Sequence, residues 1–241
     1  MTGCMTSLTQ ITHSDARVEV APPAGVELVA YLRARPRAER SEPVLKSSVA
    51  PLGLYPSKRI IDVCVAGAAL VALAPLMIAL WLLVVLFNGG PGLFWSERIG
   101  RHGRTFWMPK YRTMDANAPL SPRETLQGAN GHITQLGAFL RRSSLDELPQ
   151  LFCVFFGQMS LIGPRPLLPD DPAIFERHSF PHAMLARPGL SGLAQVVGRN
   201  EVTPRRKARL DALYARTVSP RVDLFIFWRT AMIVLSGRGQ I

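Results

Sequence analysis

The sequence contains few cysteines and few acidic residues. Its 241 residues include three cysteines, Cys4, Cys64 and Cys153, which are widely separated. Scattered cysteines of odd number, without metal-ligand spacing, provide neither a disulfide framework nor a zinc site, and indicate a reducing compartment. No zinc-finger, RRM or KH signature is present, so we expect no nucleic-acid partner. No positively charged start leads into an apolar core near Met1, so we also expect no secretory signal.

The shortage of acidic residues leaves the chain strongly basic. There are 17 Asp and Glu against 28 Lys and Arg, which gives a formal net charge of +11. Most of the excess follows residue 88, where twenty basic residues face eleven acidic ones. A surface of this kind suits nucleic acid, anionic lipid or phosphorylated substrates.

The chain divides into three segments. Residues 1–57 are rich in Pro, Ala, Ser and Arg with little apolar periodicity, which predicts a disordered tail. Residues 63–87 contain no charged or strongly polar side chain, and a helix of that length would be about 37 Å long, enough to cross a bilayer. We therefore expect a membrane segment over 58–88 and a catalytic domain over 89–241.

Pro75 lies at the centre of the apolar block, where it removes a backbone hydrogen bond and kinks or breaks a helix. The alternatives are a kinked span and a re-entrant helix hairpin that enters and leaves by one face. Basic residues flank the block on both sides, and cytoplasmic flanks attract Lys and Arg, so the pattern favours the hairpin.

The remainder predicts a small α+β, mostly helical domain. Residues 92–95 and 105–108 read as two strands joined by a glycine-punctuated basic turn, with Trp95 and Trp107 suited to a membrane interface. Residues 115–132 are polar, with Pro and Gly, and predict a loop. Helices are expected over 134–142, 204–217 and 222–235, the last of them interfacial.

Two adjacent carboxylates, Asp146 and Glu147, precede the apolar run 151–156. Ser144 and Glu147 have capping-box spacing, and Pro149 fits only the first turn of a helix, so we expect a helix to begin here. The positive end of that helix would keep Asp146 ionised beside groups that bind phosphate, and an ionised carboxylate is a potential nucleophile towards phosphorus. The alternative is a helix cap with a solvated acidic pair. A glycoside hydrolase is disfavoured because adjacent helical residues point about 100° apart and cannot face each other across a bond.

Cations that could balance phosphate charge are distributed around this pair. Phosphoryl transfer depends largely on positioned cations and a divalent metal. Arg165 lies between two prolines that stiffen its backbone, which favours a phosphate contact. The other candidates are Lys110, Arg112, Arg141, Arg142 and Arg199.

Many ordered blocks of the chain match one family. They are Lys58-Arg59 with Asp62, the Pro-split apolar block, Gly89-Gly90-Pro91, Glu97-Arg98, Lys110 to Met114, Arg142 to Gln150, Met159 to Pro166, Arg187 to Gln195, Gly198-Arg199-Asn200, and Asp211 with Tyr214. Over about residues 57–239 the sequence resembles the bacterial sugar transferase family, the monotopic polyprenyl-phosphate phosphoglycosyl transferases. Without several upstream membrane helices, it looks like the short, exopolysaccharide-initiating form.

The resemblance implies transfer of a sugar 1-phosphate from a UDP-sugar to undecaprenyl or another polyprenyl phosphate, with Mg²⁺, at the cytoplasmic face of the bacterial inner membrane. The family's Asp-Glu dyad falls on Asp146 and Glu147. The resemblance therefore implies that Asp146 is the nucleophile that forms a phosphosugar-aspartyl intermediate and releases UMP, and that Glu147 helps to hold the metal. Glu97, Arg98 and Gln195 join the candidate cations as expected substrate contacts. Two positions depart from the family pattern: Ser96 stands where Gln is common, and Gln158 stands where Asp is frequent.

A rival from another class is a non-catalytic, basic membrane or nucleic-acid adaptor, which would bind anions in a salt-sensitive way without turnover. It is disfavoured because the cations are interleaved with rigid Gly and Pro turns. The identity of the sugar and the oligomeric state, a homo-oligomer among the alternatives, are left open by the sequence.

Overall fold

The computed structural model of the chain describes residues 55, 57–88, 90–115, 132–197 and 203–236. The predicted disordered tail lies almost wholly outside these ranges. So do Arg199 and most of the loop expected over 115–132.

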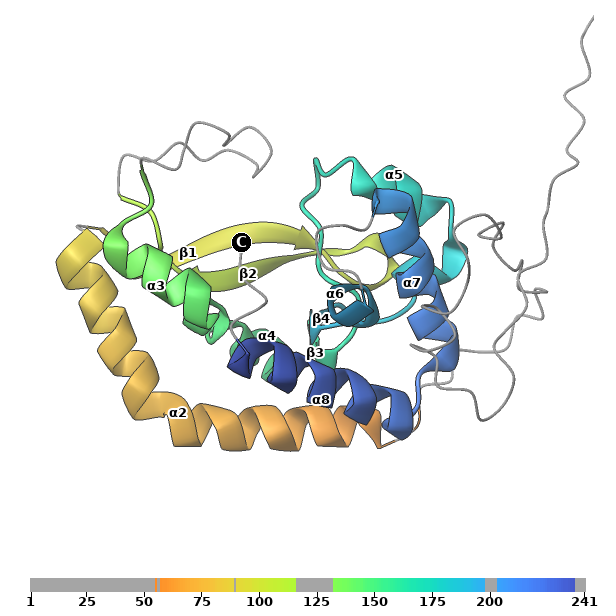
Figure 1. Cartoon of the computed structure of the whole chain (residues 1–241), viewed down its shortest axis with the longest axis horizontal. Coiled ribbons are helices and arrows are strands. Elements are labelled where there is room, and N and C mark those ends of the chain that lie inside the picture. The colour runs from red at the N-terminus through yellow and green to blue at the C-terminus, as the bar shows by residue number, and fades with distance from the viewer. Residues whose placement is uncertain (1–54, 56, 89, 116–131, 198–202, 237–241) are drawn as a thin grey trace, which may run out of the picture. The chain divides into compact units, whose positions relative to one another are not determined.

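The apolar block forms one helix, α2 (Lys58–Asn88), which contains Pro75. The helix bends sharply part-way along its length (Figure 1), as a proline inside a helix leads one to expect. The prediction of two helices separated by a break is therefore not confirmed, because the structure shows one bent helix. Its re-entrant path through a membrane stays a prediction.

α2 is long and apolar enough to cross a membrane. Only 17% of its most apolar window is buried, and Val71, Leu86 and Phe87 are 79%, 75% and 72% exposed. The core helix of a soluble protein would cover such side chains, so this surface is available to lipid.

Strands β1 (Leu93–Ile99) and β2 (Thr105–Tyr111) form the predicted hairpin, and both are longer than expected. The 3-10 turn η2 (Arg101–Gly103) joins them, with His102 and Gly103 in the left-handed region. Lys110 pairs with Phe94, and Trp107 pairs with Glu97 on the opposite face. Trp95 and Trp107 are exposed there, although their place at a membrane interface stays a prediction.

The rest of the described chain is mostly helical, which confirms the expected fold class apart from the hairpin in α2. β3 and β4 form a second, parallel two-stranded sheet. The elements in order are α3 (Gln135–Ser143), η4 (Leu145–Glu147), α4 (Gln150–Phe156), β3 (Ser160–Ile162), α5 (Ala173–His178), η5 (Pro181–Met184), β4 (Gly189–Ser191), α6 (Leu193–Val197), α7 (Pro204–Thr217) and α8 (Pro220–Leu235).

Local signals at the helix starts explain why three of these helices begin where they do. The Thr203 hydroxyl accepts from the backbone N–H of Arg206 at the start of α7, and Ser219 does the same for Val222 at α8. A proline follows each cap at the first helical position. Thr134 caps α3 through the N–H of Gly137.

Two apolar clusters join α2 to the rest of the chain. The first half of α2 contributes Ala66 to a cluster that includes Met108 of β2 and Val154 of α4. The second half packs with Tyr111 of β2 and Leu140 of α3. Leu148 contacts both clusters, so the segment between α3 and α4 is fixed from two sides.

The first turn of α2 also makes polar contacts with α4. Arg59 donates from Nη1 to the carbonyl oxygen of Val154 and from Nη2 to that of Phe155, both at 2.7 Å. These carbonyls belong to the last turn of α4, where a cation is favourable. The chain leaves α4 through Gly157 at φ 90°.

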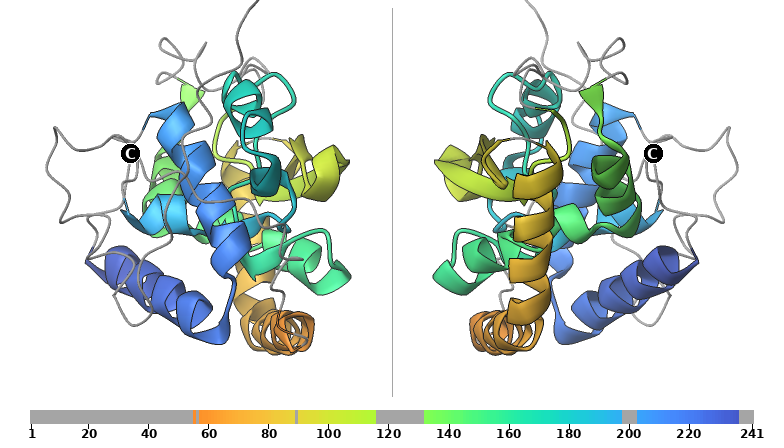
Figure 2. Two further views of the ribbon diagram at one scale, coloured as in Figure 1. Left: turned by 90° about the vertical axis from the view of Figure 1, so that its right-hand side faces the viewer. Right: turned by 90° about the vertical axis from the view of Figure 1, so that its left-hand side faces the viewer.

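α8 and the first half of α2 run along the same side of the described structure (Figures 1 and 2). α8 exposes Leu224, Phe227 and Trp228. An apolar helix with an exposed tryptophan suits the boundary between lipid and water, as the sequence predicts for 222–235.

Candidate active site

The two carboxylates lie in the single 3-10 turn η4, between α3 and α4. Ser144, immediately before them, has φ 57° and closes the end of α3 with its backbone N–H. Its side chain makes no capping hydrogen bond to η4, and α4 begins only at Gln150, after Pro149. The predicted capping box is therefore wrong: a residue in the left-handed conformation ends one helix and cannot take the extended backbone of an N-cap. Pro149 does stand at the start of a helix.

Glu147 accepts from two cations that come from distant parts of the chain. Lys110 Nζ of β2 lies 2.7 Å from Glu147 Oε1, and Arg165 Nη2 lies 3.3 Å from the same oxygen. Burial alone would raise the pKa of Glu147, but attraction to Arg165 and Lys110 and hydrogen bonds from both lower it to about 2. Glu147 is therefore ionised throughout the physiological range.

Lys110 is held in a poorly hydrated place. Burial lowers the pKa of its ammonium group, and Arg165 adds to this, while Glu147 and Asp146 oppose it. A cation with little hydration interacts more strongly with an anion that enters the site.

Asp146 is in a different environment from its neighbour. Burial raises the pKa of its carboxyl group, and adjacent Glu147 adds to the rise, whereas Lys110 and Arg141 oppose it. The sequence-based reason for an ionised Asp146, the positive end of a helix, does not apply, because Asp146 lies inside η4 and not at the start of α4. Lys110 and Arg141 oppose the rise in the pKa of Asp146 without reversing it.

Arg141 and Arg142 diverge as neighbouring helical residues must. Arg141 donates from Nε to Thr113 Oγ1 at 2.8 Å and acts electrostatically on Asp146. Arg142 is exposed. Of the two arginines expected beside the carboxylates, the structure brings in only Arg141.

The remaining predicted contacts lie elsewhere. Glu97 is on the exposed face of β1, and Arg98 is on the other face, where its Nε donates to Ser96 Oγ at 3.2 Å. Gln195 lies in α6 with Oε1 buried and no hydrogen-bond partner among the described residues. In the described part of the chain, no hydrogen bond or ion pair joins the carboxylates to Glu97, Arg112, Arg142 or Gln195. Arg199 lies outside the described residues.

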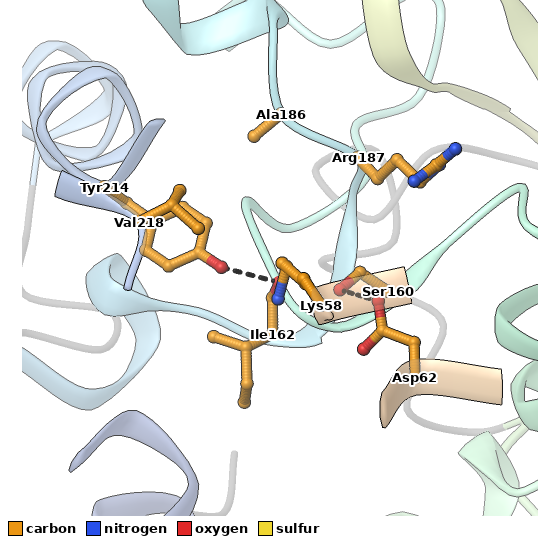
Figure 3. Close-up of a pocket in the computed structure, with 8 residues that line it drawn as sticks. All are labelled: Lys58, Asp62, Ser160, Ile162, Ala186, Arg187, Tyr214 and Val218. Atoms are coloured by element: carbon orange, nitrogen blue, oxygen red, sulfur yellow. Dashed lines mark hydrogen bonds between the residues drawn. The ribbon is translucent and has the colours of Figure 1, made fainter. Parts of the chain in front are cut away.

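A second polar cluster joins the start of α2 to β3, α7 and α8. Lys58 Nζ lies 2.5 Å from Asp223 Oδ2, and the Tyr214 hydroxyl is 2.8 Å from Asp223 Oδ1 and 2.9 Å from the carbonyl oxygen of Ile162. Asp62 accepts from the Ser160 hydroxyl at 2.7 Å. Figure 3 shows Lys58, Tyr214 and Asp62 converging on a small pocket.

Polar groups that line this pocket already form hydrogen bonds with one another. Burial and the nearby Asp223 raise the pKa of the Tyr214 hydroxyl, so it remains a proton donor. The Arg187 guanidinium points away from Lys58 and Tyr214 (Figure 3). We therefore interpret the pocket as a structural junction and place the chemistry at Asp146 and Glu147.

Sequence reasoning missed one ion pair close to the site. Arg177 of α5 and Asp211 of α7 form a buried pair, and Arg177 also reaches the backbone of Arg165. Asp211 belongs to one of the blocks that match the family, but nothing in the sequence around Arg177 distinguishes it from a surface arginine.

Glu147 is the expected magnesium ligand, and a single carboxylate suits a magnesium ion whose remaining ligands come from elsewhere. Mg²⁺ usually takes one or two protein carboxylates and completes its shell with water and substrate phosphates. Among the described residues, no group of three or more His, Cys, Asp or Glu side chains could hold a metal ion. A magnesium ion at Glu147 would therefore need water and substrate phosphate oxygens as further ligands.

Comparison with known proteins identifies the family. The family model described as "Bacterial sugar transferase" matches residues 54–237, which include every helix and strand named above.

The chain belongs to the bacterial sugar transferase family.

Relatives within the sugar transferase family differ in length. The chain is 34% identical to the exopolysaccharide production protein ExoY of Sinorhizobium fredii over 208 residues, which is 80% of this chain and 91% of that protein. It is 36% identical to the undecaprenyl-phosphate galactose phosphotransferase of Salmonella typhimurium over 199 residues, 76% of this chain and 41% of that protein. The UDP-glucose:undecaprenyl-phosphate glucose-1-phosphate transferase of Xanthomonas campestris pv. campestris is 37% identical over 76% of this chain and 39% of its own length. The chain thus spans less than half the length of the last two relatives.

Proposed function

We propose that this chain transfers a sugar 1-phosphate from a UDP-sugar to undecaprenyl or another polyprenyl phosphate, as an initiating step of exopolysaccharide or other glycan assembly. The observation that carries the proposal is the contrast within η4. Glu147 is held ionised by two cations, and Asp146 beside it is partly buried and forms no ion pair with any described residue. The names of the relatives, which include galactose and glucose phosphotransferases acting on undecaprenyl phosphate, support this reading.

Asp146 is the nucleophile in this proposal. Its carboxylate oxygen attacks the phosphorus bonded to the sugar, and the bond from that phosphorus to the bridging oxygen breaks, so that UMP leaves with the electron pair. The product is a phosphosugar joined to Asp146. Partial burial removes water that would otherwise stabilise the carboxylate and compete for the intermediate.

The lipid phosphate completes the transfer. An oxygen of the polyprenyl phosphate attacks the same phosphorus, and Asp146 leaves as a free carboxylate, which yields a polyprenyl diphosphate sugar. Lys110, Arg141 and Arg165 balance the negative charge that develops on the phosphoryl oxygens. When bound, Mg²⁺ held by Glu147 and the diphosphate would neutralise further charge.

The proposed place of this reaction is the cytoplasmic face of the bacterial inner membrane, with α2 inserted in the lipid without crossing it. The bend in α2 and the exposed apolar surfaces of α2 and α8 support a monotopic attachment. Tags placed at Met1 and at Ile241 should both be accessible from the cytoplasm only. An external Met1 tag would mean that α2 spans the membrane.

The chemical proposal is tested by UMP release from a panel of UDP-sugars, with undecaprenyl phosphate and Mg²⁺ present. Asp146→Asn should abolish release, and Asp170→Asn, which changes an exposed carboxylate, should not. Without the lipid, intact-mass measurement should find a phosphosugar on the wild-type protein and none on the Asp146→Asn variant. Full UMP release by Asp146→Asn would show that another group is the nucleophile.

A further inference from the structure

The backbone that carries Arg165 is fixed on both sides. Pro164 and Pro166 flank it and are buried, while the Arg165 side chain is about half exposed, at 47%. Each proline restricts its own backbone and that of the residue before it. The direction of Arg165 therefore depends on what holds this short segment against the domain.

The carbonyl oxygen of Arg165 is held by Arg177. Arg177 Nη2 donates to it at 2.7 Å, from α5, across twelve residues of sequence. In the described part of the chain, the backbone of Arg165 makes no other hydrogen bond. The opposite end of the same residue, Arg165 Nη2, contacts Glu147.

Arg177 is in turn fixed by Asp211. Its Nε and Nη2 lie 2.9 and 2.7 Å from Asp211 Oδ2, and the two residues are only 6% and 2% exposed. A buried ion pair often contributes less to stability than a well-packed apolar pair of the same volume, because both charges lose hydration. The Arg177 guanidinium has a further N–H beyond those that face Asp211, and this group donates to the carbonyl oxygen of Arg165. A pair of this kind is better explained by what it orients than by what it stabilises.

We propose that Arg177 and Asp211 are positioning residues that act through Arg165. Asp211 sets the plane of the Arg177 guanidinium, Arg177 fixes the Arg165 carbonyl, and the stiff Pro-Arg-Pro segment then holds the Arg165 side chain beside Glu147. Neither residue touches the substrate. The inference rests on the proposed function, because its effect is read through the transfer reaction.

The test is a double-mutant cycle between Arg177 and Arg165, measured as kcat for UMP release. Arg177→Lys keeps a positive charge for Asp211 but loses the planar fork that serves both acceptors. We expect it to lower kcat about 10-fold in the wild-type background, by loosening a group that stabilises the transition state. In an Arg165→Ala background, where there is nothing left to position, the same change should lower kcat less than about 2-fold.

A second variant guards against a folding defect. The pair Arg177→Gln with Asp211→Asn leaves no buried charge unpaired, so it should keep the fold while losing the ionic orientation. It should show the same dependence on Arg165. The matched control is Asp223→Asn, which weakens the other buried ion pair, at Lys58, and should change kcat by the same factor with and without Arg165.

The outcomes are distinguishable. If wild-type protein releases no UMP from any UDP-sugar in the panel, the proposed function fails. If the wild type is active and the Arg177 and Arg165 losses multiply, or if both Arg177 variants keep full activity, the positioning role alone is overturned.

Discussion

Replacing Lys58 by methionine should destabilise the protein more than any exposed charge change, because Lys58 neutralises a carboxylate that has little access to water. Lys58 Nζ lies 2.5 Å from Asp223 Oδ2, and the two side chains are 9% and 11% exposed. Methionine keeps most of the length of the side chain but removes the charge. Among the described residues, Asp223 would then keep the hydroxyl groups of Tyr55 and Tyr214 as side-chain donors, each at 2.8 Å.

The expected loss follows from leaving one member of a buried pair uncompensated. Such changes cost about 3–5 kcal/mol, and the two remaining hydroxyl donors favour the lower end, about 3 kcal/mol. For a chain of this size 1 kcal/mol corresponds to roughly 2–4 °C, so the unfolding temperature should fall by about 6–12 °C. Combining Lys58→Met with Asp223→Asn removes the unpaired charge but keeps groups that bond to both hydroxyls. The double variant should recover at least half of the loss.

The measurement is thermal unfolding in detergent micelles, followed by circular dichroism. Arg205→Met, at an exposed position of α7, is the control for removing a positive charge. Equal unfolding temperatures for Lys58→Met and the control would refute the reasoning. So would a double variant less stable than Lys58→Met, because that would place the cost in lost packing and not in an unpaired charge.

Three further changes probe the site and its supports. Arg59→Ala removes two hydrogen bonds to the last turn of α4 and should cost about 1–3 kcal/mol in thermal unfolding, with Arg59→Lys costing less; an unchanged unfolding temperature would contradict the capping role. Gly137→Ala would place a methyl carbon 1.9 Å from the carbonyl oxygen of Thr113, so α3 must shift, and both stability, by about 3 kcal/mol, and UMP release should fall. Lys110→Met removes a cation that opposes the raised pKa of Asp146; that pKa should rise further, the acidic limb of the pH–rate profile should move to higher pH, and the rate at neutral pH should fall about 10-fold or more. An acidic limb that stays in place would show that Asp146 does not set it.

Local patterns predicted most helices and the hairpin. The helix expected over 204–217 coincides with α7, and the one over 134–142 lies within one residue of α3 at each end. These segments combine apolar periodicity with a capping threonine, and both signals act within a few residues. Lys110 and Arg165, which pair with Glu147, were among the cations expected near the carboxylates, because phosphate chemistry requires cations near the nucleophile.

What failed was the conformation of the carboxylate segment and the contacts between distant residues. The spacing of Ser144 and Glu147 fits a capping box, but the same serine ends α3. Leu148 packs against two apolar clusters, and this tertiary packing decides whether Ser144 ends one helix or begins the next. Arg177 and Asp211 are separated by 34 residues, and no local pattern joins them. Their pairing depends on how α5 packs against α7, which a single sequence does not encode in its spacing.

The contact between Arg59 and the carboxyl end of α4 has a consequence for any attempt to obtain the enzymatic part as a soluble fragment. A fragment that begins after residue 88 would lack the apolar helix α2. It would also lack Arg59, which binds the last turn of α4, Lys58, which neutralises Asp223, and Asp62, which binds Ser160. The first turn of α2 belongs to the folding unit of the domain, whatever the rest of that helix does in the bilayer. A fragment that exchanges this apolar helix for another would have to keep residues 58–62 and begin the exchange beyond them.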